Sequence, residues 1–165
     1  MKKLNSIKRA QIIVVFAFVV VAVLSLFIKQ YGLIATLGAA IITSYLGWLK
    51  YWMDTDNFFL NLFISFNKRF DDLNEDLNLI MKGEEVNERN GKRRTKEQVV
   101  QDYLNLCSEE YYWHTKGRIP TEVRTPWKGG IDYYLQSEFI KAYFLEESQY
   151  NETYYKLFDE LNISA

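Results

Sequence analysis

The sequence has very few of the residues from which proteins build metal, redox and nucleophilic sites. It holds one cysteine, Cys107, and one histidine, His114, in 165 residues. A disulfide framework, a thiolate metal cluster and a multi-histidine metal site within one chain are therefore excluded. Neither a Walker-type phosphate loop nor a G-x-G-x-x-G turn occurs. We expect no cofactor and no metal, and we predict that the chain is not an enzyme.

Cys107 and His114 are the one pair that could act as nucleophile and base. They are seven residues apart in a predicted helix. At 1.5 Å per residue, their side chains would lie about 10 Å apart along the helix axis. Cys107 is therefore interpreted as a small core residue.

Acidic residues are absent from the first third of the chain. Residues 1–53 carry six bases and no acid. Two apolar runs, 12–28 and 33–49, are separated by a four-residue connection. Each approaches the ~20 apolar residues that cross a bilayer. The pattern predicts a transmembrane hairpin in residues 1–53, with spans at about 11–28 and 32–52. A cleavable signal peptide over the first run is the alternative.

The bases around these runs predict an orientation. Lys2, Lys3, Lys8 and Arg9 precede the first run, whereas only Lys29 lies in the connection. The positive-inside rule then places the N terminus, and after two crossings the C terminus, in the cytoplasm. The sequence predicts a protein of the bacterial inner (cytoplasmic) membrane.

A heptad pattern follows the second run. Apolar residues recur at alternating spacings of four and three, at Phe59, Phe63, Phe66, Phe70, Leu73, Leu77 and Ile80. An unbroken seam of this kind is typical of a coiled coil. It predicts a coiled-coil-like stalk helix over 54–82, beginning near Asp54 to Asp56, that joins several copies of the chain. The alternative is a single amphipathic helix packed on its own domain.

The remainder predicts a small helical module. Residues 83–96 are mostly polar and predict a basic linker. Residues 97–165 are expected to form a helical cytosolic domain. Thr95 and Gln98 fit a capping box at the first helix, and Gly117 fits its end. Pro126 and Gly129–Gly130 are expected to interrupt the second helix. A third helix is expected over 131–147, and a last one from Ser148 or Asn151. The predicted fold class is all-α.

Charge is unevenly divided within this module. Residues 89–128 hold nine bases and five acids, whereas 129–165 hold two bases and seven acids. A basic half interleaved with aromatic residues suits a ligand that carries phosphates and stacking bases. The predicted phosphate contacts are Arg93, Arg94, Lys116, Arg118, Arg124 and Lys128. The predicted base contacts are Trp113, His114 and Trp127. The alternative is that the aromatics are core residues and that the bases pair with acids; whether linker residues 89–96 contact the ligand stays open.

Two resemblances extend this interpretation. The stretches LCSEEYYWHTKGRIPTEVRTPWKGGI, FIKAYFLEES and YYKLFDEL resemble an uncharacterised family of small bacterial membrane proteins with a helical cytosolic domain. That family's pattern has tryptophan where Arg124 stands here, which adds a positive charge. The overall layout resembles CRISPR-associated membrane effectors with two spans and a soluble domain that senses cyclic oligoadenylate.

The second resemblance implies a function. It implies an antiviral defence effector whose oligomeric cytosolic domain binds a cyclic oligoadenylate, cyclic tetra-adenylate foremost, and then perturbs the membrane. The expected partners are the lipid bilayer, a cyclic oligonucleotide and further copies of the chain, with a tetramer favoured and no DNA. The alternative function is a passive membrane scaffold that tethers a cytosolic protein.

Overall fold

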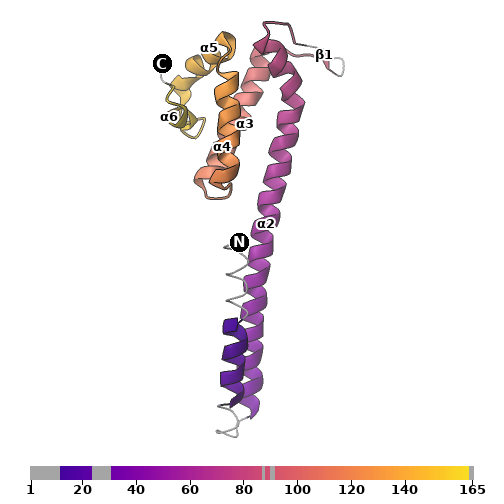
Figure 1. The fold of residues 1–165 in the computed structure, drawn as a ribbon, viewed down its shortest axis with the longest axis vertical. Coiled ribbons are helices and arrows are strands. Elements are labelled where there is room, and N and C mark those ends of the chain that lie inside the picture. The colour runs from indigo at the N-terminus through magenta and orange to yellow at the C-terminus, as the bar shows by residue number, and fades with distance from the viewer. Residues whose placement is uncertain (1–11, 24–30, 87, 90–91, 164–165) are drawn as a thin grey trace. The chain divides into compact units, whose positions relative to one another are not determined.

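The computed structural model describes residues 12–23, 31–86, 88–89 and 92–163. After a helix whose described part is 12–23, the long helix α2 runs over Tyr31–Met81 (Figure 1). Two short strands, β1 (Glu88–Arg89) and β2 (Lys92–Arg93), pair antiparallel. The helices α3 (Lys96–Thr115), α4 (Thr121–Tyr134), α5 (Glu138–Glu147) and α6 (Leu157–Leu161) follow, with a 3₁₀ turn at Ser148–Tyr150 between the last two. The predominantly helical structure agrees with the predicted all-α class.

The chain divides into two compact units, Met1–Phe58 and Phe59–Ala165, and the boundary falls within α2. In the first unit, the helix at 12–23 packs on α2 through Gly38. A Cβ atom at position 38 would lie 3.3 Å from Cε2 of Phe18, so glycine permits this approach. Most large apolar side chains of this unit remain exposed, including Ile12 and Phe16 at 68% and 69%.

The predicted transmembrane hairpin is wrong. In the parts of the chain that the structure describes, no helix combines the length and the apolar character that a bilayer crossing requires. The prediction of an inner-membrane location is wrong for the same reason. Lys2, Lys3, Lys8, Arg9 and Lys29, which oriented the hairpin, lie outside the described residues.

The second unit is built around α3, which contacts α4, α5 and α6. Thr95 caps α3 as predicted: its Oγ1 accepts a hydrogen bond from the Gln98 amide, and the Gln98 side chain accepts one from the Thr95 amide. Gly117 ends the helix with a φ of +68°, a conformation that favours glycine. The buried core includes Phe66, Leu73, Leu77, Val99, Leu104, Cys107, Ile131, Ile140, Phe144 and Phe158.

The predicted seam between copies packs inside one chain. Leu77 and Ile80 are almost fully buried in the core of the second unit, and Phe63 stacks on Trp127 with ring centroids 5.8 Å apart. In the second unit, the apolar face of α2 thus packs against the chain's own α3 and α4. The predicted helix start near Asp54 to Asp56 is also wrong, since α2 is continuous through these residues.

Two predicted helix boundaries differ as well. The helix α4 continues through Pro126 and Gly129–Gly130 to Tyr134. The break falls instead at residues 135–137, where the Ser137 side chain accepts a hydrogen bond from the Ile140 amide and caps α5. A serine cap starts a helix locally, whereas the cost of proline and glycine inside α4 is offset by burial of Arg124, Ile131 and Tyr134 on its inner side.

Candidate functional site

Within one chain, the described residues among the nine predicted ligand contacts do not gather at a single place. Arg94 precedes α3 and Lys116 follows it. A helix of twenty residues is about 30 Å long, so these two bases are separated by its full length. The side chain of Arg93 lies outside the described residues.

Arg124, which the sequence singled out as an added positive charge, is 2% exposed. Its Nη1 lies 3.5 Å from Oε2 of Glu110, and its Nη2 pairs closely with Oε2 of Glu160. Its guanidinium carbon also lies 5.7 Å from the centre of the Tyr111 ring. Arg124 is therefore a structural ion-pair residue inside the second unit and is not available to a ligand at the surface.

Other predicted contacts are also occupied within the chain. Lys128 pairs with Asp132 at 3.2 Å, and Trp127 packs on Phe63 and Phe66. The Nδ1 atom of His114 lies 2.9 Å from the carbonyl oxygen of Ile119. These contacts fit the alternative interpretation, in which bases pair with acids and aromatics belong to the core.

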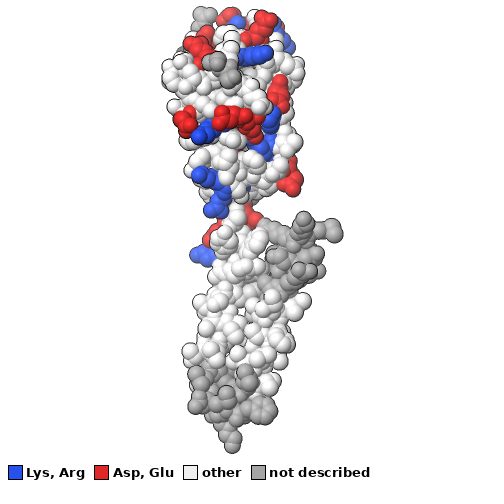
Figure 2. Space-filling view, turned by 90° about the vertical axis from the view of Figure 1, so that its left-hand side faces the viewer, with Lys and Arg blue, Asp and Glu red and all other residues white. Residues whose placement is uncertain are grey.

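The remaining predicted residues gather where α3 ends. The ammonium group of Lys116 lies 5.2 Å from the centre of the Tyr112 ring, and the Trp113 ring lies 5.2 Å from the same ring. Arg118 is exposed on the turn that follows. Figure 2 shows that Lys and Arg mix with Asp and Glu on the charged part of the molecule, with no broad surface of one sign on that face. A strongly basic ligand surface is therefore not seen on that face.

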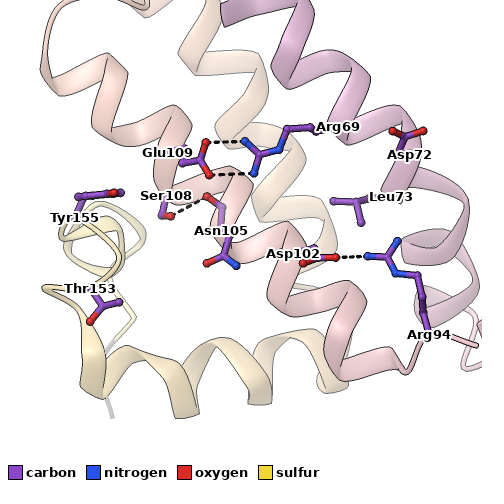
Figure 3. A pocket seen from close by; sticks show the side chains of 10 residues that line it. All are labelled: Arg69, Asp72, Leu73, Arg94, Asp102, Asn105, Ser108, Glu109, Thr153 and Tyr155. Atoms are coloured by element: carbon purple, nitrogen blue, oxygen red, sulfur yellow. Dashed lines mark hydrogen bonds and ion pairs between the residues drawn. The ribbon is translucent and has the colours of Figure 1, made fainter. Parts of the chain in front are cut away.

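A different cleft, of about 440 Å³, lies between α2, α3 and the turn before α6 (Figure 3). It is lined by Arg69, Asp72, Leu73, Arg94, Asp102, Asn105, Ser108, Glu109, Thr153 and Tyr155. Arg94 is the one predicted ligand residue that it contains. Its volume lies within the range of ligand pockets.

Two arginines stand in this cleft, each against a carboxylate. Arg69 meets Glu109 in a two-pronged pair, with Nη1–Oε2 at 2.6 Å and Nη2–Oε1 at 3.0 Å. This contact raises the pKa of Arg69 above its ordinary value. Arg94 pairs closely with Asp102, and its Nη1 lies 3.8 Å from the buried Oδ2 of Asp76. Charge-assisted pairs of this geometry are also those by which arginine binds phosphates.

Neutral polar groups complete the cleft. Ser108 donates to the carbonyl oxygen of Asn105 at 2.8 Å. The side-chain amide of Asn105 and the hydroxyl of Thr153 make no hydrogen bond among the residues that the structure describes. In Figure 3, α3 presents Asn105 on one side of the opening, and the turn before α6 presents Thr153 and Tyr155 on the other.

That turn has a strained backbone. Tyr155 and Lys156 have φ of 54° and 67°, in the left-handed region. For residues other than glycine this costs about 1–3 kcal/mol each, and such strain concentrates at functional sites. Asn151 holds the turn, because its Nδ2 donates to Asp159 at 2.7 Å and its Oδ1 accepts from the Phe158 amide at 3.2 Å. The sequence held no signal for this arrangement, since it depends on residues from three elements.

The Cys107 thiol is not part of any site. It is buried in the core, and burial followed by the nearby Glu110 charge raises its pKa well above the ordinary value. A thiol of this kind is inert. Its interpretation as a core residue is confirmed.

Comparison of the chain with protein-family models, with curated proteins and with solved structures gives no match. The two resemblances noted from the sequence therefore receive no support from these comparisons. The resemblance to the membrane effectors also loses the two spans on which part of it rested. The cleft between α2, α3 and the turn before α6 therefore provides the main evidence for a function.

Proposed function

We propose that the chain is a non-catalytic sensor of an adenine nucleotide messenger in antiviral defence, and that the messenger binds in the cleft between α2, α3 and the turn before α6. The membrane part of the sequence-based expectation is not retained. The observation that carries the proposal is the strained turn, which presents Tyr155 across the cleft from the side-chain amide of Asn105.

The groups in the cleft match the parts of a nucleotide. Tyr155, 48% exposed, offers an aromatic face on which a base can stack. An asparagine amide can pair with the N6 and N7 edge of adenine, through one acceptor and one donor. Arg69 and Arg94 can exchange their carboxylate partners for phosphate oxygens.

Size and charge limit the form of the ligand. The cleft lining holds two arginines and three carboxylates, so it does not attract several phosphates at once. A volume of about 440 Å³ is suited to one nucleotide unit. A ring of four nucleotides would therefore use one cleft from each of several copies, which links the cyclic tetra-adenylate hypothesis to assembly of the chain.

The Arg69–Glu109 pair supplies a means of response. It joins α2 to α3, from positions 40 residues apart in the chain. A phosphate that binds Arg69 in place of Glu109 would remove this connection between α2 and α3, and the chain could then respond to the ligand by a shift between connected and disconnected states. A ligand shifts such an equilibrium only by its difference in affinity for the two states.

The test is calorimetric titration of the full chain with cyclic tetra-adenylate, with adenosine and cytidine monophosphates as controls for size and base. Binding that falls at least tenfold in Asn105→Ala and in Tyr155→Leu, but not in Tyr150→Leu, supports the proposal. Tyr150 is a matched control because it is exposed and does not line the cleft.

Two results contradict this assignment. If Arg118→Glu abolishes binding while the cleft variants bind normally, the ligand site lies at the end of α3, as the sequence predicted. If no nucleotide binds the folded chain, the sensor proposal fails altogether.

A second function is favoured by a separate observation, the exposed apolar surface of the first unit. The described residues 12–23 and 31–49 contain no charged side chain, and Figure 2 shows this part white. Exposed apolar surface of this extent marks an interaction site. As a scaffold, the chain would associate through this surface with further copies. Sedimentation of the full chain would show concentration-dependent assembly, and Phe16→Asp would reduce it.

A further inference from the structure

A second cavity in the second unit is distinct from the cleft and is not used by the proposed function. It has a volume of about 230 Å³, which corresponds to roughly seven or eight water molecules. Three aromatic residues line it, Phe70 from α2, Tyr103 from α3 and Trp127 from α4. Gly130 and Glu110 also line it. A pocket of this size can hold only a small ligand.

The aromatic walls are held in place by packing outside the pocket. Trp127 stacks on Phe63 at 5.8 Å and meets the edge of Phe66 at 5.9 Å. Tyr103 makes an edge contact with Tyr134 at 5.3 Å. The pocket is therefore formed before any ligand arrives, which avoids an ordering cost on binding.

The charges beside the pocket do not balance. Arg124 carries one positive charge between Glu110 and Glu160, which carry two negative charges when ionised. Glu160 has the closer contacts, through Nε and Nη2 of the guanidinium. The Glu110 contact, at 3.5 Å to Nη1, is longer, and that nitrogen has no hydrogen-bond partner in the described part of the chain. Glu110 is thus a carboxylate that is only 7% exposed, and its contact with Arg124 is too long for a good hydrogen bond.

The other titratable groups around Glu110 do not balance its negative charge. Arg69 on α2 also attracts the Glu110 carboxylate, but it forms its two-pronged pair with Glu109. Burial raises the pKa of Glu110 to about 7, against the lowering by Arg124 and Arg69. Tyr103 and Cys107 also face it from α3, and both stay neutral because burial raises their pKa. When Glu110 and Glu160 are both ionised, one of their two negative charges has no counter-ion among the described residues, because Arg124 supplies a single positive charge.

We infer that this pocket binds a small organic ammonium ion, with Phe70, Tyr103 and Trp127 around the cation and Glu110 as its counter-ion. Aromatic faces attract ammonium groups, and the attraction is largest where water is excluded. Asn67 lines the same pocket; its Nδ2 donates to the Phe63 carbonyl at 2.9 Å, so its side-chain oxygen is the group that can accept from a ligand.

The first experiment compares two ligands of the same shape in calorimetric titrations of the full chain. Choline carries the positive charge, and 3,3-dimethylbutan-1-ol replaces its ammonium nitrogen with carbon. We expect choline to bind and the neutral alcohol to bind at least tenfold more weakly. Equal binding of the two would overturn the inference, because shape alone would then explain it.

The second experiment follows choline binding against pH. Only the ionised form of Glu110 attracts the cation, so the apparent affinity scales with the ionised fraction. With a pKa of about 7, this fraction rises about tenfold between pH 6 and pH 8. Glu110→Gln should remove both the affinity and its pH dependence, whereas Glu122→Gln, on the exposed start of α4, should change neither. A pH-independent affinity would contradict the role of Glu110.

A steric pair separates the pocket from the rest of the surface. Gly130 lines the pocket, whereas Gly129 is exposed, and added Cβ atoms at both meet open space. Gly130→Leu should block choline, and Gly129→Leu should leave its affinity unchanged. Both variants keep Glu110 and Arg124, so the charges beside the pocket are unchanged. Thermal melting of each variant shows whether it is folded. Equal binding by the two variants would place the cation elsewhere and overturn the inference.

Discussion

Replacement of Glu110 by glutamine is expected to stabilise the protein at neutral and alkaline pH, although it removes a charge that faces Arg124. The folded-state pKa of Glu110 is about 7, raised from an ordinary 4.5 mainly by burial. Between these values the folded chain holds a proton that the unfolded chain has lost. Stability therefore falls as pH rises from about 4.5 to 7. The loss is complete above about pH 8.

The magnitude follows from the shift. About two and a half pKa units at ~1.4 kcal/mol each correspond to roughly 3 kcal/mol of lost stability. Glutamine resembles the protonated acid and does not titrate, so Glu110→Gln avoids this loss. Arg124 keeps Glu160 as its partner, with contacts closer than that to Glu110. The variant should exceed the wild type by less than about 1 kcal/mol at pH 5 and by about 3 kcal/mol above pH 8.

The assay is urea unfolding of the full chain, followed by circular dichroism at several pH values from 5 to 8.5. The deciding quantity is the difference in unfolding free energy between the variant and the wild type at each pH. Contributions from the other titrating groups are the same in both proteins and cancel in this difference. Glu122→Gln serves as the control and should show a constant difference near zero. If Glu110→Gln were less stable than the wild type at pH 8, the reasoning would be refuted, because the Glu110–Arg124 attraction would then exceed the cost of burial.

Three further substitutions follow from the same structure. Arg124→Met should cost about 3–5 kcal/mol of unfolding free energy at pH 8, because Glu110 and Glu160 lose their shared partner. Leu77→Ala should cost about 2–5 kcal/mol in urea unfolding, independent of protein concentration, because Leu77 is fully buried within one chain. Gly129→Ala should raise thermal stability by about 0.5–1 kcal/mol, since the position is helical and open.

Each has a result that contradicts it. A loss smaller than about 1 kcal/mol in Arg124→Met would mean that the two carboxylates do not depend on this arginine. A Leu77→Ala effect that vanishes at low protein concentration would restore the seam between copies. A destabilising Gly129→Ala would mean that this position is not part of a regular helix. Sedimentation alongside the unfolding series provides the concentration control.

Local signals in the sequence predicted several features correctly. The Thr95 and Gln98 capping box, the turn at Gly117 and the burial of Cys107 all appear in the structure as expected. The linker was expected at 83–96, and the structure places the region between helices at 82–95. These features depend on residues within one or two turns of each other, so the sequence contains their cause.

Contacts between distant residues could not be predicted in this way. The heptad period of α2 showed which face is buried, but the same apolar face can pack on another copy or on the chain's own helices. Likewise, the sequence predicted Arg124 to be a surface charge, because its partners Glu110 and Glu160 come from other helices and could not be identified from the sequence. The apolar runs 12–28 and 33–49 predicted a transmembrane hairpin, whereas no helix in the described parts of the chain has the length and apolar character of a span.

The sequence by itself thus determined the helical class, the helix caps and which residues are apolar enough to be buried. Only the tertiary structure decided what covers the apolar face of α2, where the arginines find their carboxylates, and that Asn105 and Tyr155 face one cleft. The physical reason is range. Propensity and capping act between neighbours along the chain, whereas packing and ion pairing depend on which elements the complete fold brings together.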